Sequence, residues 1–402
     1  MQYSLSEKFK NTTQGQRADE ILGKCVHCGM CTATCPTYQL LGDELDGPRG
    51  RIYQIKQVLE GEQATATMQL HLDRCLTCLS CETTCPSGVE YGKLAEIGKE
   101  IIEEQVTRPL LDRIKRKLLR LVIPYPARFA FFFKIGLFFK VFLPASLKQQ
   151  MNSPKQEGAW PKTKHSRKML VLNGCVQSVM SSNINAAAAR VLDKLEISLL
   201  PVSESGCCGA VSLHLQASEE AKTFMRNNID AWWPYIEDGI EAIVMTASGC
   251  GTVVKDYADH LSDDALYAEK AKRVSELVKD ISEIIANEDL SKFITESNKK
   301  IAAHIPCSLQ HGQQLNGVVE TILTKTGYTL TLVKDAHLCC GSAGTYSLLQ
   351  TEISNTLRDN KLDALQKGKP DLITTANIGC LHHLQSGTEK PVLHWIELLD
   401  KA

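Results

Sequence analysis

The sixteen cysteines of this 402-residue chain fall into four groups of four. Two groups are compact and share the pattern C-x2-C-x2-C-x3-C-P: Cys25, Cys28, Cys31 and Cys35 before Pro36, then Cys75, Cys78, Cys81 and Cys85 before Pro86. The other two groups are spread along the chain: Cys175, Cys207, Cys208 and Cys250, then Cys307, Cys339, Cys340 and Cys380. Any fold of this chain has to gather these thiols.

The compact pattern is typical of a cubane [4Fe-4S] site, with three cysteines in one loop and a fourth before a proline. Zinc sites of four cysteines also use C-x2-C pairs and are the competing interpretation. In two-cluster ferredoxins the fourth cysteine of each run ligates the other cluster. We therefore expect cluster 1 at Cys25, Cys28, Cys31 and Cys85, and cluster 2 at Cys75, Cys78, Cys81 and Cys35.

Disulfides are a second reading of an even cysteine count. The N-terminus from Met1 to Lys8 lacks the apolar core of a secretory signal. The thiols are therefore expected in a reducing cytoplasm, where clustered cysteines usually bind metal.

The second half of the chain is an internal repeat. Its cysteines recur at offsets of 132, 132, 132 and 130 residues, both copies read Cys-Cys-Gly, and a glycine precedes each last cysteine. Each copy alternates strand-like and helical runs. The strands are expected at 169–172, 197–202 and 242–246, then at 301–305, 329–333 and 372–375, with helices at 184–195 and 315–326. Such alternation predicts two pseudo-symmetric α/β units on parallel sheets, with the cysteines at the strand ends.

The expected fold class is α+β multidomain. A helical two-cluster ferredoxin domain, with helices at 18–22 and 49–61, is predicted over residues 1–105. A basic aromatic linker follows over 106–168. The first Cys-Cys-Gly domain is expected over 169–290 and the second over 300–402.

The sequence does not decide which metal, cluster or disulfide the Cys-Cys-Gly cysteines form. Adjacent cysteines point in different directions, so an unusual geometry is expected, with Gly209 and Gly341 letting the backbone approach closely. A cubane, a non-cubane cluster, zinc or a redox disulfide would each use four thiols. His311 and His382 lie within a few residues of Cys307 and Cys380, while His27 lies inside the first cluster loop.

The linker is strongly basic. From Arg108 to Lys148 there are ten basic residues against one acid, Asp112, whereas the whole chain has a net charge of −1. The stretch also carries two phenylalanine-rich runs, interrupted by prolines and basic residues that exclude a helix of about 20 apolar residues. Two roles are open for it: packing against other domains or a partner subunit, and binding an anionic membrane surface.

Motifs for nucleotides and for hydrolysis cannot be placed. There is no G-x-G-x-x-G opening a strand–helix unit, no G-x-x-x-x-G-K-[ST] and no Ser/His/Asp arrangement. No nucleic-acid partner is expected. Nothing in the chain receives a hydride, so a flavin would have to lie on another subunit.

These motifs resemble those of the bacterial glycolate oxidase iron-sulfur subunit family. The resemblance covers the paired cysteine runs, Gly47-Pro48-Arg49-Gly50-Arg51-Ile52 between them, the basic aromatic linker and the two Cys-Cys-Gly domains, the second ending Ala376-Asn377-Ile378-Gly379-Cys380. It implies an electron-transfer subunit that takes electrons from FAD-containing flavoprotein subunits oxidising glycolate. It also implies delivery toward membrane quinone, at the inner face of the cytoplasmic membrane.

Other members of the same superfamily supply the alternatives. These are iron-sulfur subunits of lactate or anaerobic glycerol-3-phosphate dehydrogenase, and heterodisulfide reductase, a thiol/disulfide reductase. In the last, each Cys-Cys-Gly domain has a fifth cysteine. Here Ala247 and Asn377 stand at the corresponding positions, which argues against the non-cubane cluster and its disulfide chemistry.

Overall fold

The computed structural model describes residues 2–139 and 157–401, which form two compact units. The first unit contains residues 2–116 and 337–357, and the second contains residues 117–139, 157–336 and 358–401. The loop with Cys339 and Cys340 therefore belongs to the unit that holds the eight N-terminal cysteines.

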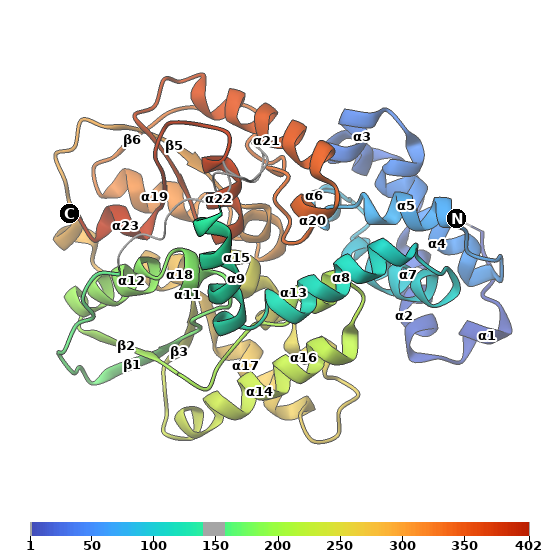
Figure 1. Ribbon diagram of the computed structural model, residues 1–402, viewed down its shortest axis with the longest axis horizontal. Helices are drawn as coiled ribbons and strands as arrows, with labels where there is room; N and C mark the ends of the chain where they lie inside the picture. Colours follow the sequence, from blue (N-terminus) through green and yellow to red (C-terminus); the bar gives the residue numbers. More distant parts are fainter. Residues whose placement is uncertain (1, 140–156, 402) are drawn as a thin grey trace. The chain divides into compact units, whose positions relative to one another are not determined.

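The first unit is built from short helices around one apolar core (blue to cyan in Figure 1). Ile21, Leu22, Ile55, Leu59 and Leu94 are fully buried in it. The elements are α1 (Glu7–Lys10), α2 (Thr13–Lys24), η1 (Met30–Thr34), α3 (Pro36–Leu41), η2 (Glu44–Asp46), α4 (Pro48–Glu60), α5 (Ala66–Asp73), α6 (Ser80–Thr83), α7 (Tyr91–Gln105) and α20 (Tyr346–Leu349).

Both predicted helices of this unit are present. The one expected at 18–22 is the centre of α2, which begins after Thr12, whose hydroxyl accepts a hydrogen bond from Gly15 N. The one expected at 49–61 is α4. Pro48 suits its first position, and Gly61 ends it at φ +109°.

The second unit contains two four-stranded parallel sheets with the same strand order, β2-β1-β3-β4 and β6-β5-β7-β8. The first sheet consists of β1 (Arg167–Val171), β2 (Ile197–Pro201), β3 (Ala242–Met245) and β4 (Val278–Asp280). The second consists of β5 (Lys300–His304), β6 (Thr329–Leu330), β7 (Leu372–Thr375) and β8 (Val392–His394). The predicted parallel repeat is confirmed.

Helices connect the strands of each sheet, as parallel crossovers require, and further helices follow the last strand of each copy. In the first copy these are α11 (Gln177–Met180), α12 (Asn183–Lys194), α13 (Ala210–His214), α14 (Ser218–Glu237), α15 (Ser248–Lys255), α16 (Tyr257–His260), α17 (Ala268–Leu277) and α18 (Ile281–Ala286), followed by η4 (Leu290–Phe293). In the second they are η5 (Ser308–Gly312), α19 (Val318–Lys325), α21 (Thr351–Gln366), which begins within the first unit, α22 (Ile378–Gln385) and α23 (Ile396–Leu399).

The six expected strands all form, although β6 has two residues where five were expected, and α19 begins three residues late. β4 and β8 were not expected. Each has three residues, too few for a period-two pattern to be recognised.

The basic linker forms two helices, α8 (Leu110–Val122) and α9 (Pro126–Phe138). Among the described residues no single helix is long and apolar enough to cross a membrane. Taken together, α8 and α9 have the length and apolar composition of a membrane-crossing segment, but the two helices are bent by 113° relative to each other. The part of the predicted linker from 140 to 156, which includes Lys140 and Lys148, lies outside the described residues.

Candidate metal centres

The first ferredoxin pocket collects the thiols expected for cluster 1. Cys25, Cys28, Cys31 and Cys85 all line it, together with Cys81. Burial, and next the charge of Cys25, raises the pKa of the Cys31 thiol to about 11. The fourth cysteine of the second run thus lies beside three cysteines of the first run.

The second ferredoxin pocket collects the thiols expected for cluster 2. Its lining includes Cys35, Cys75, Cys78 and Cys81. Burial raises the pKa of Cys81. Burial alone would also raise the pKa of Cys75, but the charges of Arg51 and Lys99 and the hydrogen bonds from Tyr91 and Thr77 together outweigh burial and lower the pKa of that thiol. Each lining includes the four thiols expected for one cluster, which is the donor set of a cubane, and Cys81 lies on the wall shared by the two pockets. The residues present therefore fit two such clusters.

Hydrogen-bond donors surround the sulfurs of the second ferredoxin pocket. The Cys75 Sγ accepts bonds from Thr77 N at 3.4 Å and from the Tyr91 hydroxyl at 3.5 Å. The Cys35 Sγ lies 3.3 Å from Thr37 Oγ1. Such bonds stabilise negative charge on a ligand sulfur and are one of the controls on a cluster's potential.

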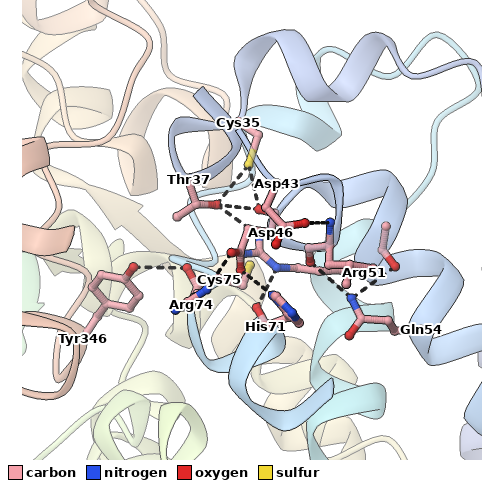
Figure 2. Close-up of polar contacts among 12 residues, drawn as sticks. Cys35, Thr37, Asp43, Asp46, Arg51, Gln54, His71, Arg74, Cys75 and Tyr346 are labelled. Carbon is pink, nitrogen blue, oxygen red and sulfur yellow. Dashed lines mark hydrogen bonds and ion pairs between the residues drawn. The ribbon is translucent and has the colours of Figure 1, made fainter. Parts of the chain in front are cut away.

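A buried ion-pair network lies behind this pocket (Figure 2). Asp46 is completely buried, and its carboxylate contacts His71 Nδ1 at 3.0 Å, Arg74 at 2.8 Å and Arg51 at 3.5 Å. Asp43, Asp46 and His71 have the donor spacing of a cation site. Two guanidinium groups on Asp46 disfavour a cation there, so the cluster is an ion-pair network.

The first Cys-Cys-Gly set comes together in the second unit. Cys175 follows β1, Cys207 and Cys208 follow β2, and Cys250 lies on α15 after β3. In the order β2-β1-β3-β4, the chain passes from β1 to β2 on one side and then crosses to β3 on the other side of β1. The strand order therefore changes direction between β1 and β3, which is the usual place for a site in a parallel sheet. The predicted position at the strand ends is confirmed for this copy.

The four thiols of this set interact directly. Cys207 is hydrogen-bonded to Cys175 and Cys208, and these bonds raise its pKa. The Cys208 sulfur accepts from Cys207 and Cys250, which lowers the pKa of Cys208 and raises that of Cys250. The adjacent cysteines thus contact different partners, as expected for an unusual geometry.

Buried polar groups hold the loop that presents them. Asn228 on α14 donates to the Cys207 carbonyl at 2.8 Å, and the Tyr257 hydroxyl donates to the Cys208 carbonyl at 2.9 Å. Gly209 has φ +94°, and its N–H lies 3.4 Å from the Cys207 Sγ. The backbone, including the predicted glycine, is therefore fixed around the sulfurs.

The second Cys-Cys-Gly set is divided between the two units. Cys339 and Cys340 belong to the first unit, whereas Cys307, after β5, and Cys380, on α22 after β7, belong to the second. Gly341 repeats the local geometry of the first copy, with φ +88° and its N–H 3.4 Å from the Cys339 Sγ.

One histidine near the cysteines was not recognised from the sequence. His304 on β5 and Cys380 offer ligand atoms within 4.8 Å of each other, although 76 residues separate them. His304 is buried, and burial lowers its pKa to about 3, so the ring is a neutral ligand candidate. His382 instead contacts the Ser181 hydroxyl at 3.1 Å. His27 lines the first ferredoxin pocket, as its position in the loop suggested.

Asn377 occupies the position of the missing fifth cysteine. Its Nδ2 donates to the Cys380 Sγ at 3.4 Å, and its Oδ1 accepts from Gly249 N at 3.2 Å. An amide at this position donates to a thiolate and cannot supply a fifth sulfur. Only the folded structure reveals that this side chain also links the two copies.

Comparisons with protein families identify the modules. Residues 21–89 match the 4Fe-4S dicluster domain, and residues 169–255 and 301–385 match the Cysteine-rich domain. Together with the thiol pockets, these matches define an iron-sulfur protein with a ferredoxin-type module and two Cys-Cys-Gly modules.

Comparison with individual proteins narrows the class. The chain is 55% identical over its whole length to the glycolate oxidase iron-sulfur subunit of Escherichia coli, covering 99% of that protein. It therefore belongs to the family of glycolate oxidase iron-sulfur subunits. It is 28% identical to the probable glycolate oxidase iron-sulfur subunit of Bacillus subtilis, with 93% and 91% of the two chains covered.

More distant relatives share only part of the chain. Lactate utilization protein A of Bacillus velezensis is 25% identical over 56% of this chain and 96% of its own length. A crystal structure of a hypothetical protein from Helicobacter pylori matches 98% of this chain and 73% of its own, with a TM-score of 0.57 and 10% identity. That last likeness concerns the fold alone.

Proposed function

We propose that this chain is the iron-sulfur electron-transfer subunit of a flavin-dependent glycolate (2-hydroxy acid) oxidase complex. In this proposal it takes electrons from a partner flavoprotein and passes them toward membrane quinone. The observation that carries it is the pair of neighbouring pockets in the first unit, whose linings each include the four thiols that the crossed cysteine runs predict for one cluster.

Four thiolates per cubane are a full complement, one for each iron, which leaves no iron open for a substrate. When bound, such a cluster accepts and donates one electron at a time. The chain's own residues would hold the cubanes, donate hydrogen bonds to the Cys75 sulfur from Thr77 and Tyr91, and bury the ligands Cys25, Cys75 and Cys81 in the surrounding core. These pockets therefore suit electron transfer between clusters rather than substrate binding.

We assign the ligands as the spacing predicts: Cys25, Cys28, Cys31 and Cys85 for cluster 1, and Cys75, Cys78, Cys81 and Cys35 for cluster 2. Anaerobically purified protein is expected to contain at least about eight irons per chain, from two [4Fe-4S] clusters. Cys28→Ser and Cys78→Ser should each reduce the iron content. Zinc in place of iron in the wild type would overturn the assignment.

The Cys-Cys-Gly sets are proposed to hold further iron-sulfur clusters, with zinc as the alternative occupant. The mutual hydrogen bonding of the first set supports a shared metal ligand group. Metal analysis of the wild type beside Cys208→Ser decides between them. Iron lost in the variant supports a cluster, zinc lost supports a zinc site, and no metal lost contradicts both.

The activity test uses the chain with and without its partner. The isolated chain is expected to be brown and inert toward glycolate, because the described residues contain no flavin motif or open metal position to oxidise it. Adding the flavoprotein subunits should restore glycolate-dependent dye reduction. Glycolate oxidation by the isolated chain would refute a purely electron-transferring role.

A disulfide reductase is the less favoured function. Asn377 hydrogen-bonds the Cys380 Sγ where that chemistry would call for a fifth thiol. Turnover of a heterodisulfide by the purified chain, abolished in Cys207→Ser, would reverse this preference.

Binding to the cytoplasmic face of a membrane is part of the proposal, and α9 is the element that supports it. Phe131, Phe132, Ile135 and Phe138 are all exposed and fall on one side of the helix at helical spacing, with exposed Lys134 among them. Apolar side chains beside a basic one suit an anionic lipid surface.

Sedimentation with vesicles of phosphatidylglycerol and phosphatidylcholine tests this role. Binding should weaken in Phe131→Ser/Phe138→Ser and at high salt. The matched control is Leu266→Ser, which removes an exposed apolar side chain far along the chain from α9. Loss of flavoprotein binding without any vesicle binding would assign α9 to a protein partner instead.

A further inference from the structure

The two arginines of the Gly47-Pro48-Arg49-Gly50-Arg51 segment serve different pockets. Arg49 lines the first ferredoxin pocket and Arg51 lines the second. Both project from the first turn of α4. Gly50 between them has no room for a side chain, because a Cβ would overlap the Glu44 carbonyl. One helical turn therefore delivers one guanidinium to each pocket.

The two guanidinium groups differ in burial and in pairing. Arg49 is 37% exposed and pairs with Glu44, which is 41% exposed, so water screens its charge. The Arg51 side chain is only 1% exposed. Its Nε donates to the His71 carbonyl at 2.8 Å and a terminal nitrogen donates to Thr37 Oγ1 at 3.2 Å, so its position is fixed.

The region behind the second ferredoxin pocket holds a buried positive charge, that of Arg51 (Figure 2). Arg51 and Arg74 both pair with the buried carboxylate of Asp46, whereas the nearby carboxylate of Asp43 is exposed, so water screens its charge. A guanidinium stays protonated in folded proteins, and burial keeps water away from the Arg51 charge. The Arg51 charge is therefore permanent and unscreened beside the sulfurs.

A [4Fe-4S] cluster gains one negative charge on reduction. A fixed positive charge in a medium of low dielectric constant stabilises the reduced form more than the oxidised form, because the attraction grows with the cluster's charge. Net charge and burial are among the main controls on such potentials.

We propose that Arg51 raises the midpoint potential of the cluster in the second ferredoxin pocket, and thereby sets it above that of the cluster in the first. This inference rests on the proposed cluster occupancy. Arg51 acts through the electrostatic field at the ligand sulfurs, so it is a positioning and tuning residue, not a ligand.

The test is a potentiometric titration, followed by EPR, of the full chain purified anaerobically with its clusters. Arg51→Gln should lower one of the two ferredoxin-type potentials. We expect at least a tenfold change in the reduced-to-oxidised ratio at a fixed poise, which is about 59 mV for one electron. Arg51→Lys should keep most of the parent value because it keeps the charge. Arg49→Gln, the matched control on the same helical turn, should leave that potential in place.

Arg74→Gln is a second variant that places less demand on folding, since the Arg74 side chain is 28% exposed. It should shift the same potential downward by a smaller amount. The inference would be overturned if Arg51→Gln and Arg74→Gln both retain their iron and neither variant changes either ferredoxin-type potential. Wild-type protein without iron would instead refute the proposed function. If Arg51→Gln does not fold, an unchanged potential in Arg74→Gln alone contradicts the charge argument.

Discussion

At the scale of single residues, three glycines in the left-handed region differ in the space around them. Gly42 has φ +67°, and a Cβ added there would meet no heavy atom of the described residues within 4 Å. A Cβ on Gly209 would lie 3.1 Å from the Ala221 carbonyl oxygen, and one on Gly341 would lie 2.5 Å from that of Ser354. Glycine is therefore required at Gly209 and Gly341 for two reasons: the positive φ angle and the lack of space for a Cβ.

Substitution of these glycines by alanine should destabilise the protein in a graded order. Gly42→Ala is expected to cost about 1 kcal/mol from conformation alone. Gly209→Ala should cost somewhat more, and Gly341→Ala the most, because the added Cβ would lie 3.1 Å from a backbone oxygen at Gly209 but 2.5 Å from one at Gly341. Denaturant unfolding of the three variants measures the order. Equal costs would show that the contacts to Ala221 and Ser354 relax freely.

A buried histidine predicts how stability depends on pH. His394 is completely buried, and burial lowers its pKa to about 4. The unfolded chain, with an ordinary histidine pKa near 6.5, then binds more protons than the folded chain between pH 4 and 6.5. Stability should rise with pH across this window and be lost as the pH falls through it, by up to roughly 3 kcal/mol.

His394→Asn should flatten that dependence. Asparagine retains an acceptor where His394 Nδ1 now accepts from Ile396 N at 3.3 Å, but it does not titrate. The check is the difference in unfolding free energy between variant and parent at several pH values from 4 to 8. His304, with its pKa also lowered, keeps part of the slope in both proteins. A difference that stays constant with pH would contradict a neutral, buried His394.

At the scale of elements, a network of charges joins α5 and α7 to the start of α8. Arg108, whose side chain is only 6% exposed, contacts Asp73 at 2.6 Å and Glu103 at 2.6 Å. Arg116 on α8 contacts the same Asp73 oxygen at 3.1 Å. Asp73 is therefore the shared acceptor that orients the first turns of α8.

Asp73→Asn should destabilise the first unit by about 1–3 kcal/mol, because it leaves a buried guanidinium partly unpaired. Asp112→Asn is the control. Asp112 also contacts Arg108 and Arg116 but is 31% exposed, so its loss should cost less than about 1 kcal/mol. Thermal unfolding of both variants gives the comparison. Equal effects would mean that burial of Asp73 does not strengthen the pairs.

At the scale of the whole molecule, the first unit depends on its cysteines. Cys25, Cys75 and Cys81 are part of its apolar core. Several of its helices are short, with six residues in α3 and four in α6. Helices of this length are not stable by themselves. The loop with Cys339 joins the same unit, where the Tyr346 hydroxyl donates to the Arg74 carbonyl at 3.1 Å (Figure 2).

Removal of the metal should therefore loosen the first unit selectively. After oxidation and chelation of iron, hydrogen exchange is expected to accelerate across residues 25–91 and 337–357, since metal binding is coupled to folding. Strands β1 and β3, whose order rests on apolar packing, should keep their protection. Equal acceleration in the strands would show that one cooperative unit spans the chain.

The sequence by itself determined the four thiol sets, the repeat and the parallel α/β character of its two copies. Local spacing is enough to predict these features, because a cluster loop and an alternating strand–helix pattern each depend on residues that are close together in the sequence. The crossed grouping of Cys35 and Cys85 also followed from spacing.

Only the tertiary structure decided which other side chains reach the thiols. Arg51 and His304 approach cysteines far away in the sequence, and Asn377 accepts a hydrogen bond from Gly249 of the other copy, through helix packing and strand register that no local pattern records. The assignment of the loop of Cys339 to the first unit has the same origin. Long-range packing places charges and donors around sites whose ligands the spacing alone predicts.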